Sequence, residues 1–435
     1  MLYLILIFAI IFAIFSWLRL NWSVATIVLL LPTYLIRFEV AGIPMTLLEL
    51  MILIVFVVWF LKVVIGKQKI SFSKYKWWIL SLLLIVTLSV FVSESRLAAW
   101  GIWKAYFVEP VLFFLVLINT VKTKKEWGLI VGALFFSALG VAIPAIIQKF
   151  TGWCIPNEFW RAEGTRRVTS WFGYPNAVGL YLAPIAMFFA GLLMQGKIRV
   201  IETFKKTKKI KVCWQSILSF VFFIVALLAI VFAGSEGAII GLAAGLIFLG
   251  LIYPYRLTRL ATIIVLFFCF LAFLFIPSIH NYALEKFTMS DRSGQIRVQQ
   301  WKETWAMLQD DHQIMGGGLA NYQTAIKPYH AEGVWIKDKN DSAWLEKIRT
   351  SEEFRIKNWQ PTEIYLYPHN VLFNFWSEIG LFGASIFLIL VLKFLSGYWL
   401  VRGKENREMY LILMSVLVVI LVHGLVDVPY FKNDL

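Results

Sequence analysis

The feature that most constrains the fold is a series of about twelve apolar runs, each near the length that an α-helix needs to cross a bilayer. Hydrophobic residues make up 60% of the 435-residue chain and charged residues only 15%. A soluble domain is about half apolar and about a quarter charged. The sequence therefore predicts an all-α polytopic membrane protein. The runs occupy residues 2–18, 22–38, 45–65, 77–93, 106–121, 127–150, 172–194, 215–232, 236–252, 258–277, 371–395 and 409–428.

Basic residues are concentrated in every second loop between these runs. The formal net charge of +15 would suggest a nucleic-acid partner in a soluble protein. In a membrane protein, alternating basic loops are explained by orientation, because they stay on the cytoplasmic side. We therefore expect membrane lipids around the chain, no nucleic acid, and an N-terminus on the outer side. The basic loops lie at about residues 62–76, 122–125, 197–211, 256–259 and 402–407.

One outer loop is far longer than the others. It spans about residues 278–368, has nearly balanced charge and contains five tryptophans. Its first part, Asp291–Gln309, has the pattern of an amphipathic helix. Long loops in compact proteins are often functional. We therefore divide the chain into a bundle at 1–277, this partly helical loop at 278–368, and C-terminal transmembrane helices at 369–435.

A histidine stands where the long loop re-enters the membrane. His369 and Asn370 are followed by nine residues and then by Gly380 and Gly383, in the pattern H-N-x9-G-x-x-G. An imidazole at the outer mouth of a span can exchange protons near neutral pH and can meet a membrane-bound substrate. Glu378, an ionisable group inside the same span, is a second functional candidate. The alternative is that His369 caps the helix and Glu378 pairs with a neighbouring helix.

Arginine and tryptophan share one face at the start of the long loop. Arg297 and Trp301 are one helical turn apart, and Arg292 precedes them. A guanidinium can hold two oxygens of a phosphate, and an indole can stack on a sugar ring or on the arginine. The alternative interpretation is a solvated surface helix.

A second group of cations lies in another outer loop. Arg166 and Arg167 are on the side where basic residues are disfavoured, so an anionic ligand such as a pyrophosphate could compensate for them. Neighbouring acids, such as Glu158 and Glu163, could do the same. Near the outer end of the last run, His423 and Asp427 are four residues apart, and we interpret them as a structural pair.

The sequence contains none of the common nucleotide, zinc or serine-hydrolase motifs. Its three cysteines, Cys154, Cys213 and Cys269, are far apart and match no metal-site spacing. We therefore expect no cofactor and no metal. Any group that the protein transfers would have to arrive already activated.

Taken together, these motifs resemble the O-antigen ligase and polymerase superfamily. The run from His369 to Gly383 resembles the superfamily signature, and the Arg297-x3-Trp301 segment opens a long outer loop as in that family. The run 172–176 resembles the family's F-x-x-P-N helix entry, and the run 423–429 resembles its last-helix H-x-x-x-D element. The resemblance covers roughly 160–430, with the elements in the same order.

The resemblance implies a glycosyltransferase C-type bundle in a bacterial inner membrane, with its active site facing the periplasm or exterior. It implies metal-independent, inverting transfer of a glycan from undecaprenyl diphosphate to a lipid or glycan acceptor, as in lipopolysaccharide biosynthesis. His369 would match the essential histidine and Arg297 the loop arginine that meets the diphosphate, with Arg292, Trp301, Arg166, Arg167 and Asn370 as substrate-binding candidates.

The chain departs from the family pattern at one place. Many members have Ser-Arg-Gly at the outer start of a mid-chain helix, where this chain has Ser235-Glu236-Gly237. A cation is therefore missing there, and either Arg166 or Arg167 replaces it or the substrate differs. A polysaccharide polymerase, a membrane transporter and a non-catalytic scaffold for envelope assembly remain alternatives to the ligase function.

Overall fold

The structure is a computed structural model. It describes residues 2–40, 42–67, 69–207, 214–338, 341–398 and 406–431. Cys213, Arg402, Lys404 and the basic side chains of the predicted inner loop at 197–211 lie outside what is described.

Helices dominate the described chain, and it is a multi-pass membrane protein. Among the described residues, eight helices are long and apolar enough to cross a bilayer: α3 (Leu47–Ile65), the continuous α5–η2–α6 helix (Arg96–Thr120), α7 (Lys124–Thr151), α9 (Pro175–Thr207), α10 (Trp214–Ala233), α12 (Arg256–Phe275), α18 (Val371–Ser396) and α20 (Arg407–Gly424). Four shorter helices are also apolar: α1 (Leu2–Leu18), α2 (Leu20–Leu29), α4 (Lys76–Val92) and α11 (Glu236–Ile252). All twelve predicted runs therefore contain apolar helix, while a count of twelve spans stays a prediction.

Two predicted spans differ from the structure. The run 22–38 is not one helix, because α2 ends at Leu29 and the chain continues as a 3₁₀ turn, η1 (Leu31–Leu35), and a strand, β1 (Arg37–Val40). Pro32 has no N–H to continue the helical hydrogen bonds. β1 then pairs antiparallel with β2 (Ile43–Thr46). The run 106–121 begins earlier than predicted, because α5 (Arg96–Ile102) and a π-helical turn, η2 (Trp103–Val108), lead directly into α6 (Glu109–Thr120).

The best-packed region is formed by α9, α10, α11 and α20. Small residues let these helices approach closely, as is usual between membrane helices. At Gly245 of α11, a Cβ atom would lie 2.6 Å from Val419 and 3.0 Å from the backbone oxygen of Ser415, both on α20. Larger side chains such as Phe189, Phe222 and Leu242 fill the space around this contact.

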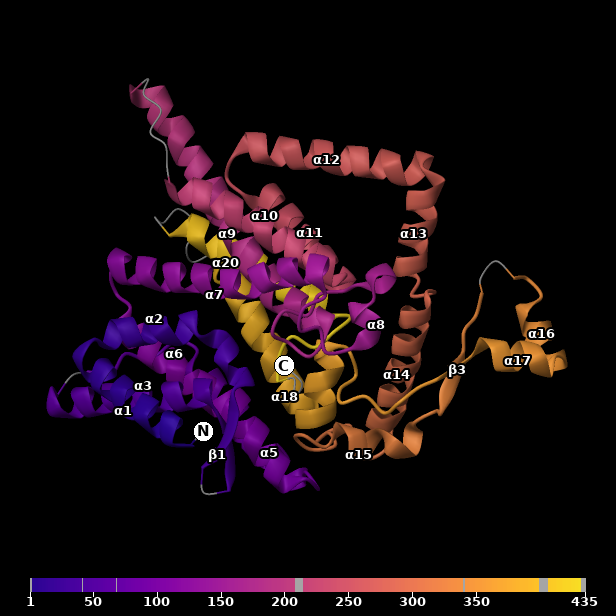
Figure 1. Ribbon diagram of the computed structural model, residues 1–435, viewed down its shortest axis with the longest axis horizontal. Coiled ribbons are helices and arrows are strands. Elements are labelled where there is room, and N and C mark those ends of the chain that lie inside the picture. Colours follow the sequence, from indigo (N-terminus) through magenta and orange to yellow (C-terminus); the bar gives the residue numbers. More distant parts are fainter. Residues whose placement is uncertain are drawn as a thin grey trace.

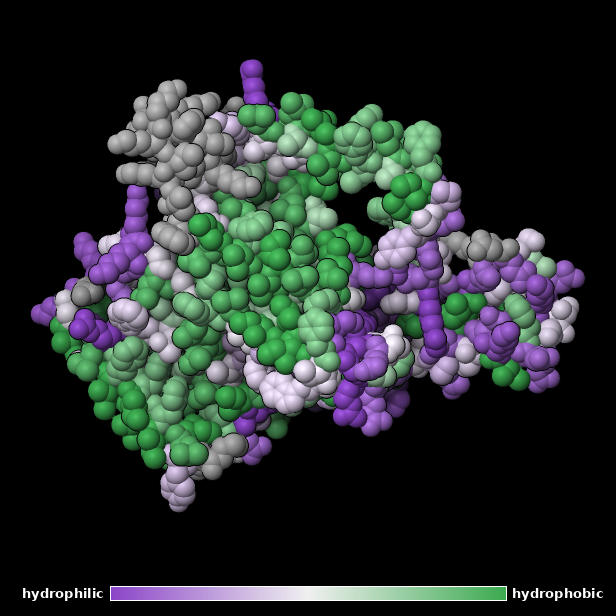
Figure 2. Space-filling model, turned by 45° about the horizontal axis from the view of Figure 1, so that its top comes forward, coloured by the Kyte–Doolittle hydropathy of each residue, from purple (hydrophilic) through white to green (hydrophobic). Residues whose placement is uncertain are grey.

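The outer segment predicted as a long loop consists mostly of short ordered elements. The predicted amphipathic helix is confirmed as α14 (Arg292–Gln309), which follows α13 (Pro277–Phe287). Figure 1 shows α12, α13 and α14 framing one side of the molecule, with α16 and α17 on an arm beyond them. In Figure 2 hydrophobic side chains cover the helices, while hydrophilic ones gather on this arm. The remaining elements are α15 (Tyr322–Ile326), η4 (Lys327–Tyr329), β3 (Gly333–Trp335), α16 (Trp344–Thr350), α17 (Glu352–Asn358) and β4 (Trp359–Pro361), β3 and β4 being antiparallel.

The helix that carries the histidine motif is broken at Gly380. This glycine has φ 71° and ψ 179°, so α18 consists of two helical pieces. The outer segment fills the break: the Leu381 N–H donates to the Ile314 oxygen at 3.1 Å, and the Gly317 N–H donates to the Ser377 oxygen at 2.6 Å. Buried Glu378 accepts from the Ala320 N–H at 2.8 Å. Glu378 therefore anchors the outer segment in the membrane helix.

Candidate active site

His369 lies at the outer end of α18 and is held by its neighbours on every side. Its φ of 46° is left-handed, which is uncommon for a residue with a side chain. The imidazole is 19% exposed and lies between Tyr365 and Tyr367, with ring centroids 5.2 and 4.9 Å away. Its Nδ1 makes no hydrogen bond to any described residue. The two tyrosine rings thus confine the imidazole, and its Nδ1 is turned into the protein.

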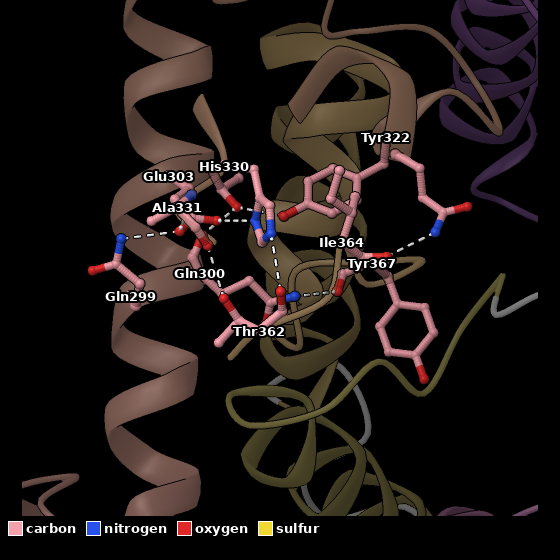
Figure 3. Close-up of polar contacts among 11 residues, drawn as sticks. Gln299, Gln300, Glu303, Tyr322, His330, Ala331, Thr362, Ile364 and Tyr367 are labelled. Atoms are coloured by element: carbon pink, nitrogen blue, oxygen red, sulfur yellow. Dashed lines mark hydrogen bonds and ion pairs between the residues drawn. The ribbon is translucent and has the colours of Figure 1, made fainter. Parts of the chain in front are cut away.

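Two side chains of α14 hold the backbone that leads into His369. Gln300 donates from Nε2 to the Tyr367 oxygen, and Trp301 donates from Nε1 to the Pro368 oxygen, both at 3.0 Å. Figure 3 shows Gln300 reaching across from α14. Trp301 therefore positions the histidine loop, a contact not foreseen in the sequence-based prediction of a stacking surface.

A second cluster on α14 supports the same loop (Figure 3). Glu303 accepts from the Ala331 N–H and lies 3.2 Å from the His330 Nδ1. The other imidazole nitrogen of His330 lies 3.2 Å from the Thr362 oxygen. These contacts join α14 to residues 330–331 and, through His330, to Thr362, which lies shortly before the histidine loop.

A buried carboxylate faces His369. Asp427, just beyond the end of α20, has a side chain only 3% exposed, and its Oδ1 lies 3.7 Å from Nδ1 of His369. Its Oδ2 accepts from Nδ2 of Asn176 at 3.3 Å, at the start of α9. A carboxylate beside an imidazole can orient the ring and stabilise its protonated form. The structure thus links the last helix to the histidine, whereas we had interpreted Asp427 as a structural partner of His423.

Arg167 extends this polar chain. Its guanidinium donates to Oδ1 of Asn176 at 3.0 Å and to the oxygens of Ala233 and Gly234 at 2.8 and 3.0 Å. Burial lowers the pKa of Arg167 from its usual range; Glu236 opposes this shift, and the positive charge of Arg297 adds to it. Two guanidinium groups are therefore close enough for their charges to interact, although an arginine stays protonated under such shifts.

Arg297 is the second of these cations. Its Nη1 donates to Ser293 at 2.9 Å, while its buried Nε has no hydrogen-bond partner among the described residues. Burial and the charge of Glu363 raise the pKa of Tyr365, and the positive charge of Arg297 opposes them. Since Tyr365 contacts His369, the structure brings Arg297, Arg167 and His369 into one neighbourhood.

The other site candidates lie around this cluster with partners of their own. Arg166 donates to the oxygens of Lys149 and Phe150 and closes the end of α7, instead of pointing to the cluster. Arg292 is exposed and contacts the Gln360 side chain. Asn370 caps α18 and donates from Nδ2 to the Leu425 oxygen at 3.1 Å, so it ties α18 to the end of α20.

The corner where the family arginine is missing is occupied by an ion-pair network. Glu236, at the start of α11, pairs with Lys286 of α13 at 2.7 Å and accepts from the Tyr282 hydroxyl at 3.1 Å. Arg167 binds the Gly234 oxygen of the same corner. Of the two arginines suggested as replacements, the structure places Arg167 there.

Two members of the cluster escaped the sequence-based prediction as site residues. Tyr365 lies four residues before His369, within the same recognisable motif region, so proximity in sequence could have suggested it. Asp427 could have been suggested by the H-x-x-x-D element, but its approach to His369 depends on how α20 packs on α9 and α18.

The assembled groups suit transfer chemistry at the outer ends of the helices. An imidazole backed by a carboxylate can move a proton, and two nearby guanidinium groups can hold a diphosphate. His369 and Asp427 lie beside the ends of α18 and α20, Arg167 lies in the loop before α9, and Arg297 lies on α14.

One comparison with known proteins gives a match, to a family model. A search of curated proteins finds no match to the chain. Residues 221–388 match the family model described as O-antigen ligase, which includes α14, Arg297, His369 and the break at Gly380. Members of this family are ligase or polymerase enzymes that act on lipid-linked glycans in the membrane. This match over residues 221–388 supports the resemblance of the chain to the O-antigen ligase superfamily.

Proposed function

We propose that the protein transfers a glycan from undecaprenyl diphosphate to an acceptor on the outer face of the membrane, in the manner of an O-antigen ligase. The observation that carries the proposal is the convergence of His369, Asp427, Arg167 and Arg297 from four separate segments. A glycosyltransferase C-type bundle and an active site facing the periplasm or exterior are parts of the same proposal.

The diphosphate binds between the two guanidinium groups. Arg297 has a buried Nε without a partner, and Arg167 is oriented by Asn176 and the Gly234 corner. Charge-assisted hydrogen bonds to phosphate oxygens would satisfy these donors and relieve the repulsion between the two cations. As the leaving group separates, it gathers negative charge, and the same groups stabilise that charge.

His369 handles the proton of the acceptor. The acceptor hydroxyl oxygen forms a bond to the anomeric carbon, and the bond between that carbon and the phosphate oxygen breaks. Its electron pair leaves with undecaprenyl diphosphate, and the hydroxyl proton passes to an imidazole nitrogen. Asp427 stabilises the imidazolium. A single displacement of this kind inverts the anomeric centre and needs no metal.

The lipid tail of the donor has room beside α12. This helix has no buried residue in its most apolar window, and Figure 2 shows an opening between it and the bundle. Apolar helices border the opening, and α13 leads from α12 to α14, which carries Arg297. A polyprenyl chain entering there from the bilayer would place its diphosphate near the two arginines.

Reconstituted transfer tests the proposal. Purified protein in lipid nanodiscs is given an undecaprenyl-diphosphate oligosaccharide and, in separate reactions, a lipid-linked core or a free glycan as acceptor. We expect His369→Ala to abolish transfer, because no other described group takes its place, while His312→Ala in the same outer segment retains it. Transfer to the lipid core indicates a ligase, and glycan elongation indicates a polymerase.

The opposite outcomes are equally clear. Full transfer by His369→Ala would remove the histidine from the mechanism. Movement of a lipid-linked glycan across proteoliposomes without any transferred product would instead favour a transporter.

A further inference from the structure

A separate cavity lies at the outer ends of the N-terminal helices. Its volume is about 700 Å³, which is large enough for a small ligand. The β1–β2 hairpin, the start of α3, the π-turn η2 and the start of α9 contribute its walls. None of the residues that we assign to donor binding or proton transfer lines this cavity.

A buried acid without a partner lies in the wall of this cavity. Glu109 is 1% exposed, and neither of its carboxyl oxygens has a hydrogen-bond partner among the described residues. A buried polar group left unsatisfied is costly and requires an explanation. A carboxyl group accepts hydrogen bonds when it is ionised and can also donate one when it is protonated, so hydroxyl groups, which do both, would satisfy it in either form.

One cation of the lining is engaged by other groups. Lys104, on the π-turn η2, lies 3.2 Å from Oε2 of Glu49 and donates to the Pro44 oxygen at 2.9 Å. Glu49 in turn accepts from the Thr46 N–H at 2.8 Å as part of the cap of α3. The ion pair therefore stabilises the cavity wall, and the carboxyl group of Glu109, buried in that wall, keeps no hydrogen-bond partner among the described residues.

The rest of the lining is rich in aromatic rings. Tyr34, Phe38, Tyr106, Phe172 and Tyr181 all border the cavity. Flat apolar rings pack against the C–H face of a pyranose, and carboxylates accept hydrogen bonds from its hydroxyl groups. Ligand sites commonly combine mostly apolar walls with a few polar groups in this way.

The backbone around Glu109 also departs from a regular helix. The π-helical turn Trp103–Val108 immediately precedes it and contributes Lys104 and Tyr106 to the wall. Such single widened turns occur frequently at functional sites. The helix Arg96–Thr120 is therefore irregular where it borders the cavity.

The cavity adjoins the proposed active site through two shared segments. Phe172 and Tyr181 flank Asn176, which binds Asp427, and Pro429 of the lining follows Asp427 by two residues. The Tyr430 hydroxyl donates to the backbone oxygen of Tyr106, so the same C-terminal segment is fastened to the cavity wall.

We propose that this cavity is a sugar-binding subsite in which Glu109 accepts hydrogen bonds from a sugar ring and the aromatic rings pack on its C–H face. The statement that this sugar belongs to the acceptor rests on the proposed function. The statement that the cavity binds a sugar does not depend on it. The donors on the ring are hydroxyl groups or a protonated amine, and the experiment below distinguishes them.

Saturation-transfer NMR with the full-length protein in nanodiscs measures the binding directly. The probes are methyl pyranosides of the gluco, galacto and manno configurations, together with the corresponding 2-amino sugars. We expect saturation transfer from the wild type to at least one of these sugars. Equal loss of neutral and amino sugars in Glu109→Gln indicates hydroxyl donors, while a preference for amino sugars that disappears in this variant indicates an ammonium group.

Two variants and one control make the result specific. Glu109→Gln should weaken binding roughly tenfold or more, because the amide replaces one carboxyl oxygen by an NH₂ group, and a buried donor left unpaired is costly. Gly101→Leu should also remove binding, because this lining glycine has open space around its position and a larger side chain would fill the cavity. Glu94→Gln, an exposed acid outside the lining, should leave binding unchanged.

Other outcomes overturn the inference. They are an absence of saturation transfer to every probe from the wild type, or undiminished transfer in both Glu109→Gln and Gly101→Leu. His369→Ala separates the two proposals, because it should bind sugar normally while failing to transfer glycan. Sugar binding without any glycan transfer by the wild type would leave the subsite standing and the proposed enzyme function refuted.

Discussion

α9 and α12 are both long apolar helices, yet they differ completely in their surroundings. In the most apolar stretch of each helix, 67% of the residues of α9 are buried, but 0% of those of α12. α9 carries Asn176 into the polar cluster, whereas α12 borders the opening beside the bundle. Hydrophobicity thus identifies membrane helices equally well in both cases, but only close packing indicates which of them hold a site in place.

The largest expected effect comes from disturbing the packed side. Gly245→Leu would push a side chain against Val419 and the backbone of Ser415. Overpacking of this kind costs about 1–3 kcal/mol, so we expect a clearly lower unfolding temperature and aggregation in detergent. Ala261→Leu on α12 is the matched control and should stay within about 0.5 kcal/mol of the wild type.

Size-exclusion profiles and thermal unfolding of the two variants measure this contrast. Equal destabilisation by both would mean that α12 is packed as tightly as α11. That result would remove the distinction between the two regions.

An intermediate effect is expected where the two regions are joined. Glu236 of α11 binds Lys286 and Tyr282 of α13, beyond α12. Glu236→Gln removes the ion pair, which is worth at most about 1 kcal/mol at a partly exposed position. We expect a nearly unchanged unfolding temperature but a several-fold loss of transfer, because α13 leads into the helix that bears Arg297.

Steady-state transfer and thermal unfolding are compared for this variant. Glu285→Gln, which changes an exposed acid on α13, should change neither transfer nor the unfolding temperature. A large loss of stability without a loss of transfer would show that the ion pair stabilises the fold and does not position α14.

The smallest expected effect concerns the labelling of two cysteines, which leaves the fold unchanged. Cys154 in an outer loop and Cys269 on α12 are both exposed and free. In a Cys213→Ser background, a membrane-impermeant maleimide added to spheroplasts should label Cys154, whereas Cys269 should react only with an apolar, permeant reagent. Labelling of Cys269 by the impermeant reagent would place α12 in water.

Apolar runs and charge alternation predicted most of the helical architecture, because both depend on local composition. Local sequence was also enough to recognise the motif at His369, the amphipathic helix α14 and the corner at Glu236. What escaped prediction depends on distant partners. The break at Gly380 is filled by backbone from Ile314 to Gly317, and Asp427 reaches His369 only through helix packing.

The fold prediction was wrong where a short polar interruption redirected the chain. Pro32 and the charged residues of the β1–β2 hairpin end a run that is apolar on average. Averaging over a window hides such an interruption. The cavity beside Glu109 could not be predicted, because its walls come from four segments that are brought together only by the fold.

The two hydrogen bonds from α14 to the backbone before His369 have a consequence for protein engineering. Gln300 and Trp301 hold carbonyl groups 67 residues further along the chain. Grafts exchanged between relatives should therefore carry α14 and the histidine loop together, with junctions placed before Asp291 and after Asn370. The arm bearing α16 and α17 lies between these two partners, so it can be shortened or replaced as an independent cassette.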